Sequence, residues 1–234
     1  MTKPLLDLFS GCGTGVRPFP VRRRSPVHPY TQELAARLRE LYRDDAQVRT
    51  EWPAMLWEEV RTRRHDRPSR SRMYRPVIDV AVGPFATHRR HVRDYDRMVG
   101  EYERFFSNIL SAHACNLGHF GSEYRAQSLD DLYRGNPNAR CFLAIEIEKG
   151  NPDLKYLMGS MINASALGRV GILVAWDQCR LRSLLRVREN FLYLSELGKN
   201  TFDTTNLIFL GRDQLMDALL MFASNPPWFN GRWR

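Results

Sequence analysis

Two segments with the character of β-strands carry acidic residues where apolar ones are expected. The segment CFLAIEIE, residues 141–148, contains Glu146 and Glu148, and PVIDVAVGPF, residues 76–85, contains Asp79. In a strand, residues two apart share a face, so Glu146 and Glu148 point the same way. Because an unpaired buried charge is costly, three such carboxylates together indicate a bound cation. Carboxylate oxygens in this number suit Mg²⁺ or Mn²⁺.

A run of arginines precedes these strands. Residues 61–75 read RTRRHDRPSRSRMYR, in a chain of net charge +9 and pI near 9.7. The seven arginines are Arg61, Arg63, Arg64, Arg67, Arg70, Arg72 and Arg75. Such a run is suited to neutralising a phosphate backbone, although a solvated basic loop has the same composition. A metal-holding acidic cluster in a basic protein predicts phosphodiester hydrolysis on double-stranded DNA.

The elements that position these residues follow from the apolar spacing. We expect a helix capped by Thr31, and a second helix that begins near Glu51 and places Glu59 on or beside its apolar face. Residues 76–85 and 141–148 predict strands, and residues 88–112 predict one amphipathic helix. Downstream, we expect strands at 170–176 and 206–210. We expect helices at 153–167, from the end of the 170–176 strand to about residue 197, and at 213–222. This alternation predicts an α/β protein with a sheet covered on both faces.

The order of a helix with Glu59, a strand with Asp79 and a strand with Glu146 and Glu148, followed by a helix and a strand, resembles the PD-(D/E)XK nucleases. The resemblance to this restriction-endonuclease-like superfamily implies a central mixed β-sheet flanked by helices and metal-dependent cleavage of DNA. It implies that Asp79 and Glu146 are metal ligands and that Glu59 is an additional ligand. Glu148 then takes the catalytic position that a lysine usually holds.

Three features depart from that pattern: Ile78 replaces the usual proline before Asp79, the two ligands are far apart, and the usual lysine is missing at position 148. The separation of 67 residues between Asp79 and Glu146 predicts a helical insertion over about 86–138. Asp131 is a rival to Asp79 as first ligand, but SLDDLY has the pattern of a capped helix start, and we favour Asp79. Lys155 is the candidate for the missing catalytic lysine, because Lys149 is expected to face the other side of its strand.

The overall organisation is predicted from composition. Residues 1–29 form an irregular, basic N-terminal arm, and residues 30–234 form a single nuclease-like α/β domain. The sequence has no apolar run long enough to span a membrane and no secretory leader, so we expect a cytoplasmic protein with reduced cysteines. A homodimer is plausible, with the 88–112 helix as a candidate interface.

Three alternatives stay open. The stretch LLDLFSGCGTG, residues 5–15, resembles the first motif of the AdoMet-dependent DNA cytosine methyltransferases, but prolines at 18, 20, 26 and 29 prevent the helix that must follow. A non-catalytic nucleic-acid-binding protein on the same fold would explain the arginines without the acids. A zinc site built on His113, Cys115 and His119 matches no strong ligand spacing.

Overall fold

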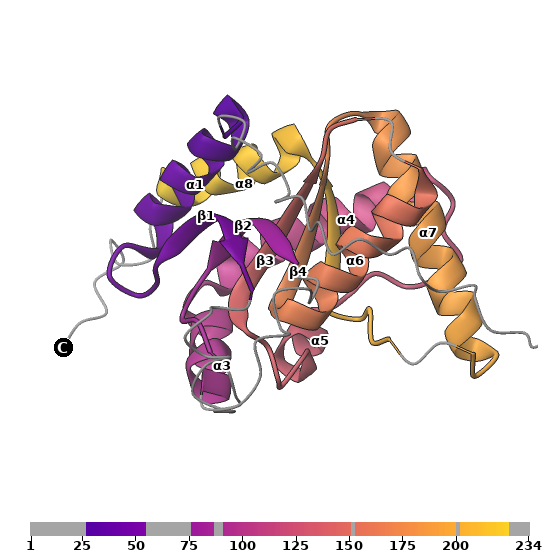
Figure 1. Cartoon of the computed structure of the whole chain (residues 1–234), viewed down its shortest axis with the longest axis horizontal. Coiled ribbons are helices and arrows are strands. Elements are labelled where there is room, and N and C mark those ends of the chain that lie inside the picture. The colour runs from indigo at the N-terminus through magenta and orange to yellow at the C-terminus, as the bar shows by residue number, and fades with distance from the viewer. Residues whose placement is uncertain (1–26, 55–75, 87–90, 151–152, 200–201, 225–234) are drawn as a thin grey trace, which may run out of the picture.

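A five-stranded mixed sheet forms the centre of the protein (Figure 1). The computed structural model describes residues 27–54, 76–86, 91–150, 153–199 and 202–224. The strands, in spatial as well as chain order, are β1 (Val48–Pro53), β2 (Val77–Val82), β3 (Cys141–Glu148), β4 (Gly168–Ala175) and β5 (Leu207–Gly211). Strands β1, β2 and β3 pair antiparallel, whereas β3, β4 and β5 pair parallel. The predicted α/β class with a mixed sheet is confirmed.

Helices cover both faces of the sheet (Figure 1). One face carries α1 (Pro29–Tyr42), α3 (Val92–Glu101), α4 (Glu103–His119), α5 (Leu129–Arg134) and α8 (Arg212–Ala223). The other carries α6 (Leu154–Leu167) and α7 (Gln178–Glu196), which are the crossovers between the parallel strands. Strand β4 is buried along its whole length because helices pack on both of its sides.

The segment between β2 and β3 belongs to the core. Its helices α3, α4 and α5 bury Tyr95, Phe106 and Leu132 in the same cluster as Phe142 of β3. The Phe142 ring lies 5.8 Å from the ring of Phe106 and 6.1 Å from that of Tyr95. The region predicted as a helical insertion is therefore helical and covers one face of the sheet.

Several predicted boundaries need correction. Helix α1 begins at Pro29, where His28 and not Thr31 is the N-cap, because the His28 Nδ1 accepts the N–H of Tyr30. The helix predicted from Glu51 is wrong over residues 51–53, which belong to β1. There the pairing with β2 outweighs the local helical pattern, and Trp52 is buried against the sheet.

The helix predicted over 88–112 is two helices. Described from residue 91, the segment breaks at Tyr102 between α3 and α4, and α4 continues to His119. The apolar stripe through Tyr95, Val99 and Phe106 is buried in the core of the chain itself. This stripe is therefore not a surface on which a second copy could dock.

Two further observations concern helices. Leu154, in the first turn of α6, is 54% exposed. Within the ranges that the structure describes, none of the helices has the length and apolar character needed to cross a membrane.

Candidate metal centre

The pairing of β2 with β3 brings the predicted acids together. The ladder joins Val82 with Leu143, Ala81 with Ala144, and Val80 with Ile145. The next positions along the two strands are Asp79 and Glu146. The first two ligands predicted from the sequence therefore lie opposite each other, where the regular ladder ends.

Glu146 and Glu148 share the face of the sheet that α6 and α7 cover. Ala81 of β2 and Ala144 of β3 both pack in the cluster beneath α6 and α7. Because alternate residues of a strand share a face, Glu146 and Glu148 follow Ala144 on this side, and the contact of Glu146 with Asn163 of α6 agrees with that placement. In β2 the alternation is interrupted next to Asp79, because Ile78 packs in the same cluster as Ala81.

Each of the two opposed carboxylates contacts the backbone of the other strand. The Ile147 N–H donates to Asp79 Oδ2 at 2.7 Å. The N–H of Asp79 and the side-chain amide of Asn163 on α6 make hydrogen-bonding contacts with the Glu146 carboxylate. These contacts supply partners to backbone groups that the ladder no longer pairs, and they fix both carboxylates in place.

Burial and mutual repulsion disfavour ionisation at this site. Glu146 is only 7% exposed, and its burial raises its pKa well above the ordinary value, as do the nearby charges of Asp79 and Glu148. Burial also raises the pKa of Asp79, against the opposing effects of the Ile147 N–H and of Lys149. A cation between these groups would relieve both costs, so the donor set fits a hard divalent ion.

A fourth acid, which the sequence interpretation missed, adjoins the site. Thr50 pairs with Val80 and Trp52 with Ile78, so Glu51 of β1 lies opposite Asp79. Its charge raises the pKa of Asp79, and its φ of 46° is unusual for a residue that is not glycine. The signal available was the strand pattern of residues 48–53, of which we interpreted residues 51–53 as the start of a helix.

The two candidate lysines differ in their surroundings. Lys155 is exposed on the first turn of α6. Lys149 donates to Thr31 Oγ1 at 3.1 Å, yet its charge also acts on Asp79 and lowers the pKa of that carboxyl group. Of the two lysines, Lys149 therefore acts electrostatically on Asp79, whereas Lys155 has no described contact with the acids.

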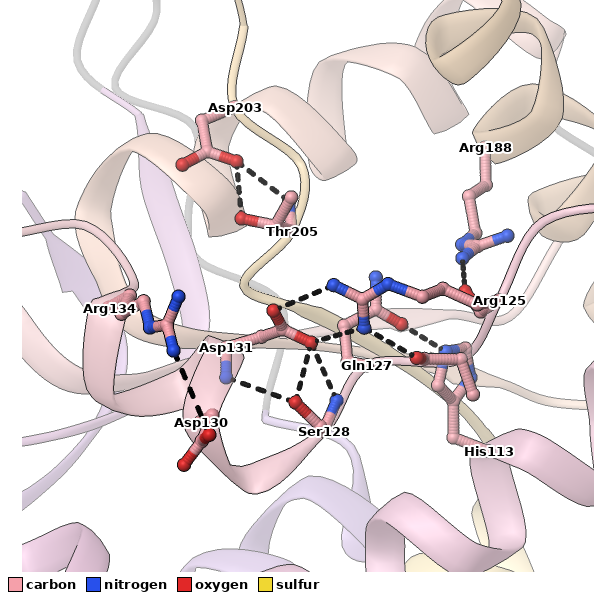
Figure 2. A network of polar contacts seen from close by, with 11 residues as sticks. His113, Arg125, Gln127, Ser128, Asp130, Asp131, Arg134, Arg188, Asp203 and Thr205 are labelled. Carbon is pink, nitrogen blue, oxygen red and sulfur yellow. Dashed lines mark hydrogen bonds and ion pairs between the residues drawn. The ribbon is translucent and has the colours of Figure 1, made fainter.

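Asp131, the rival first ligand, has a different role (Figure 2). It forms the capping box of α5 with Ser128 and receives two hydrogen bonds from the Arg125 guanidinium, at 2.7 and 2.9 Å. These donors hold the pKa of Asp131 well below its usual range. The expectation that SLDDLY is a capped helix start is confirmed. The Asp131 carboxylate is bound to Ser128 and Arg125 and not to the acids of β2 and β3.

Glu59 and the seven arginines predicted to bind nucleic acid, Arg61, Arg63, Arg64, Arg67, Arg70, Arg72 and Arg75, lie outside the described residues. So does the glycine-rich stretch 5–15. Among the side chains that the structure does describe, no three or more from His, Cys, Asp and Glu are arranged as a metal-binding group. Comparison with protein-family models, with curated proteins and with solved structures gives no significant match.

Proposed function

We propose that this protein is a divalent-metal-dependent endonuclease that hydrolyses DNA phosphodiester bonds on a restriction-endonuclease-like core. One observation carries the proposal: Asp79 and Glu146 lie opposite each other where the β2–β3 ladder ends, with Glu148 two residues farther along. The strand order supports it, because an antiparallel β1–β2–β3 unit continues through α6 into a parallel β4. This order agrees with the family that the sequence resembles.

Each side chain of the site would have a separate role. Asp79 and Glu146 would hold Mg²⁺ or Mn²⁺, with Glu148 beside them as the residue that orients and deprotonates the attacking water. When bound, the ion supplies Lewis acidity toward the phosphate and lowers the pKa of water. Asn163 and the Asp79 N–H fix the Glu146 carboxylate, and Lys149 adds positive charge near Asp79. The arginines of residues 61–75 would contact the DNA backbone.

Metal binding is tested by thermal unfolding. Ion at about 100 times its dissociation constant stabilises the folded state by about 2.7 kcal/mol, which for a domain of this size raises the Tm by about 5–10 °C. Glu146→Gln should remove this response to Mn²⁺ and abolish cleavage of duplex DNA. Asp131→Asn is the matched control, since it removes an acid of the same chain that lies outside the site and should keep both properties.

The same variant has a second expected effect, in EDTA. Because folding raises the pKa of Glu146, its ionised form destabilises the folded state, and stability falls as the pH rises above the ordinary range for glutamate. Glu146→Gln should therefore raise the Tm at pH 7.5 by a few degrees without metal. A variant that is less stable than the wild type under these conditions would contradict the proposed repulsion among the acids.

A second function is favoured by one specific contact. The Asp79 carboxylate already accepts the Ile147 N–H, a role that does not require a metal. A protein that binds DNA on this fold without cutting it would use the acids only to hold β2 and β3 in register. This alternative predicts DNA binding without Mn²⁺-dependent stabilisation and without cleavage.

A further inference from the structure

Three parallel strands end at one edge of the sheet, and a cationic residue or an aromatic residue follows each of them. Lys149 follows β3, Trp176 follows β4, and Arg212 follows Gly211 at the end of β5. The carboxyl ends of parallel strands in an open α/β sheet are where ligands commonly bind. The site residues predicted from the sequence do not include Trp176 or Arg212.

The residues of this edge are in contact with one another. The Arg212 guanidinium carbon lies 4.4 Å from the centre of the Trp176 ring, and the Lys149 Nζ lies 6.0 Å from it. The rings of His28 and Tyr30 meet Trp176 edge to face at 5.0 and 5.6 Å. Two cationic side chains are thus held around one indole.

The helix ends add to the positive potential. Helix α1 begins at Pro29, α7 begins at Gln178, two residues after Trp176, and α8 begins at Arg212, so three helices present their N-termini here. Free N–H groups and the helix dipole give such ends a partial positive charge. The first turns of α1 and α7 contain no acidic residue.

Acidic groups near this edge, Glu33 among them, offset part of that charge. Asp177 accepts the N–H of Arg180 as the N-cap of α7. Asp213 lies 3.5 Å from the Arg212 Nε, but its side chain is 85% exposed, which weakens the pair. Lys149 donates to Thr31, a neutral hydroxyl group.

We propose that Lys149 and Arg212, placed around Trp176, bind a backbone phosphate of the DNA substrate beside the acidic site. This inference rests on the proposed function and adds to it the position at which the DNA strand contacts the protein. Lys149 connects the two regions, because its charge acts on Asp79 while its ammonium group lies over Trp176. A phosphate here would sit at the ends of β3 and β5, next to Glu148.

The test is the salt dependence of DNA binding, measured in EDTA by fluorescence anisotropy of a labelled duplex. Each cation that loses a phosphate contact should lower the slope of log K against log salt by about 1. We expect this change for Lys149→Gln and for Arg212→Gln, and recovery of the slope in Lys149→Arg. The control is Arg134→Gln, an exposed arginine of α5 near the opposite edge of the sheet, which should leave the slope unchanged.

The outcomes separate the two proposals. If the wild type binds DNA and both glutamine variants keep its slope, the phosphate site is wrong and the nuclease proposal stands. If the wild type does not bind DNA at any salt concentration, both proposals fail. Circular dichroism and the Tm of each variant show whether a lost contact reflects a loss of folding instead.

Discussion

His113 is a buried histidine that should make the stability of the fold depend on pH (Figure 2). Its Nδ1 accepts the N–H of Phe209 at 3.3 Å, so its Nε2 carries the proton and donates to Gln127 Oε1 at 2.6 Å. Both ring nitrogens are satisfied in the neutral form. Burial lowers the pKa of His113 to about 4, and the charge of Arg188 contributes to this.

The magnitude follows from that shift. An unfolded histidine titrates near 6.5, so between about pH 6.5 and 4 the unfolded chain binds a proton that the folded chain does not. The stabilisation is present above pH 6.5 and is lost as the pH falls. The loss from this one group reaches about 2 kcal/mol at pH 5 and about 3 kcal/mol at pH 4.

The assay compares urea unfolding of the wild type and His113→Gln between pH 7.5 and 4.5. The variant is less stable at pH 7.5, but the difference between the two proteins should shrink by about 2 kcal/mol as the pH is lowered to 5. His119→Gln, an exposed histidine on the same helix, is the control and should follow the wild type. A constant difference across the range would show that His113 is not held neutral.

Two further predictions concern residues outside the acidic site. Asp131→Ala removes the capping box of α5 and should lower the free energy of unfolding in urea by about 1 kcal/mol. Mn²⁺-dependent DNA cleavage should persist in this variant. If a folded Asp131→Ala protein did not cleave DNA, Asp131 would again be a candidate metal ligand. Gly171→Ala should cost about 1–3 kcal/mol, because its Cβ would lie 2.5 Å from Leu207 Cδ2. Gly159→Ala, with nothing within 4 Å, should instead stabilise α6 by about 0.5–1 kcal/mol, and equal effects of the two changes would contradict the packing described.

Strand patterns were reliable where the chain is buried on both sides. The prediction over residues 141–148 coincides with β3, and that over 170–176 overlaps most of β4. Continuous apolar runs mark such strands because helices cover both faces of the sheet. The acids within the apolar run of β3 were visible for the same reason, since they interrupt a pattern that is otherwise uniform.

Local patterns failed where long-range pairing determines the conformation. The residues around Glu51 have helical apolar spacing, but pairing with β2 makes them a strand and places Glu51 beside Asp79. Strand alternation placed Lys149 on the face opposite Glu148, and its hydrogen bond to Thr31 of α1 agrees with this. The pattern did not show that the charge of Lys149 also acts on Asp79.

The sequence by itself determined the α/β class, the succession of most elements and the identity of three acids that do not suit their strands. Only the tertiary structure decided that Asp79 lies opposite Glu146, that Glu51 adjoins them, and that Lys149 and Arg212 meet at Trp176. The physical reason is that periodicity reports burial and the face of an element, whereas register and the meeting of strand ends depend on contacts between residues far apart in the chain.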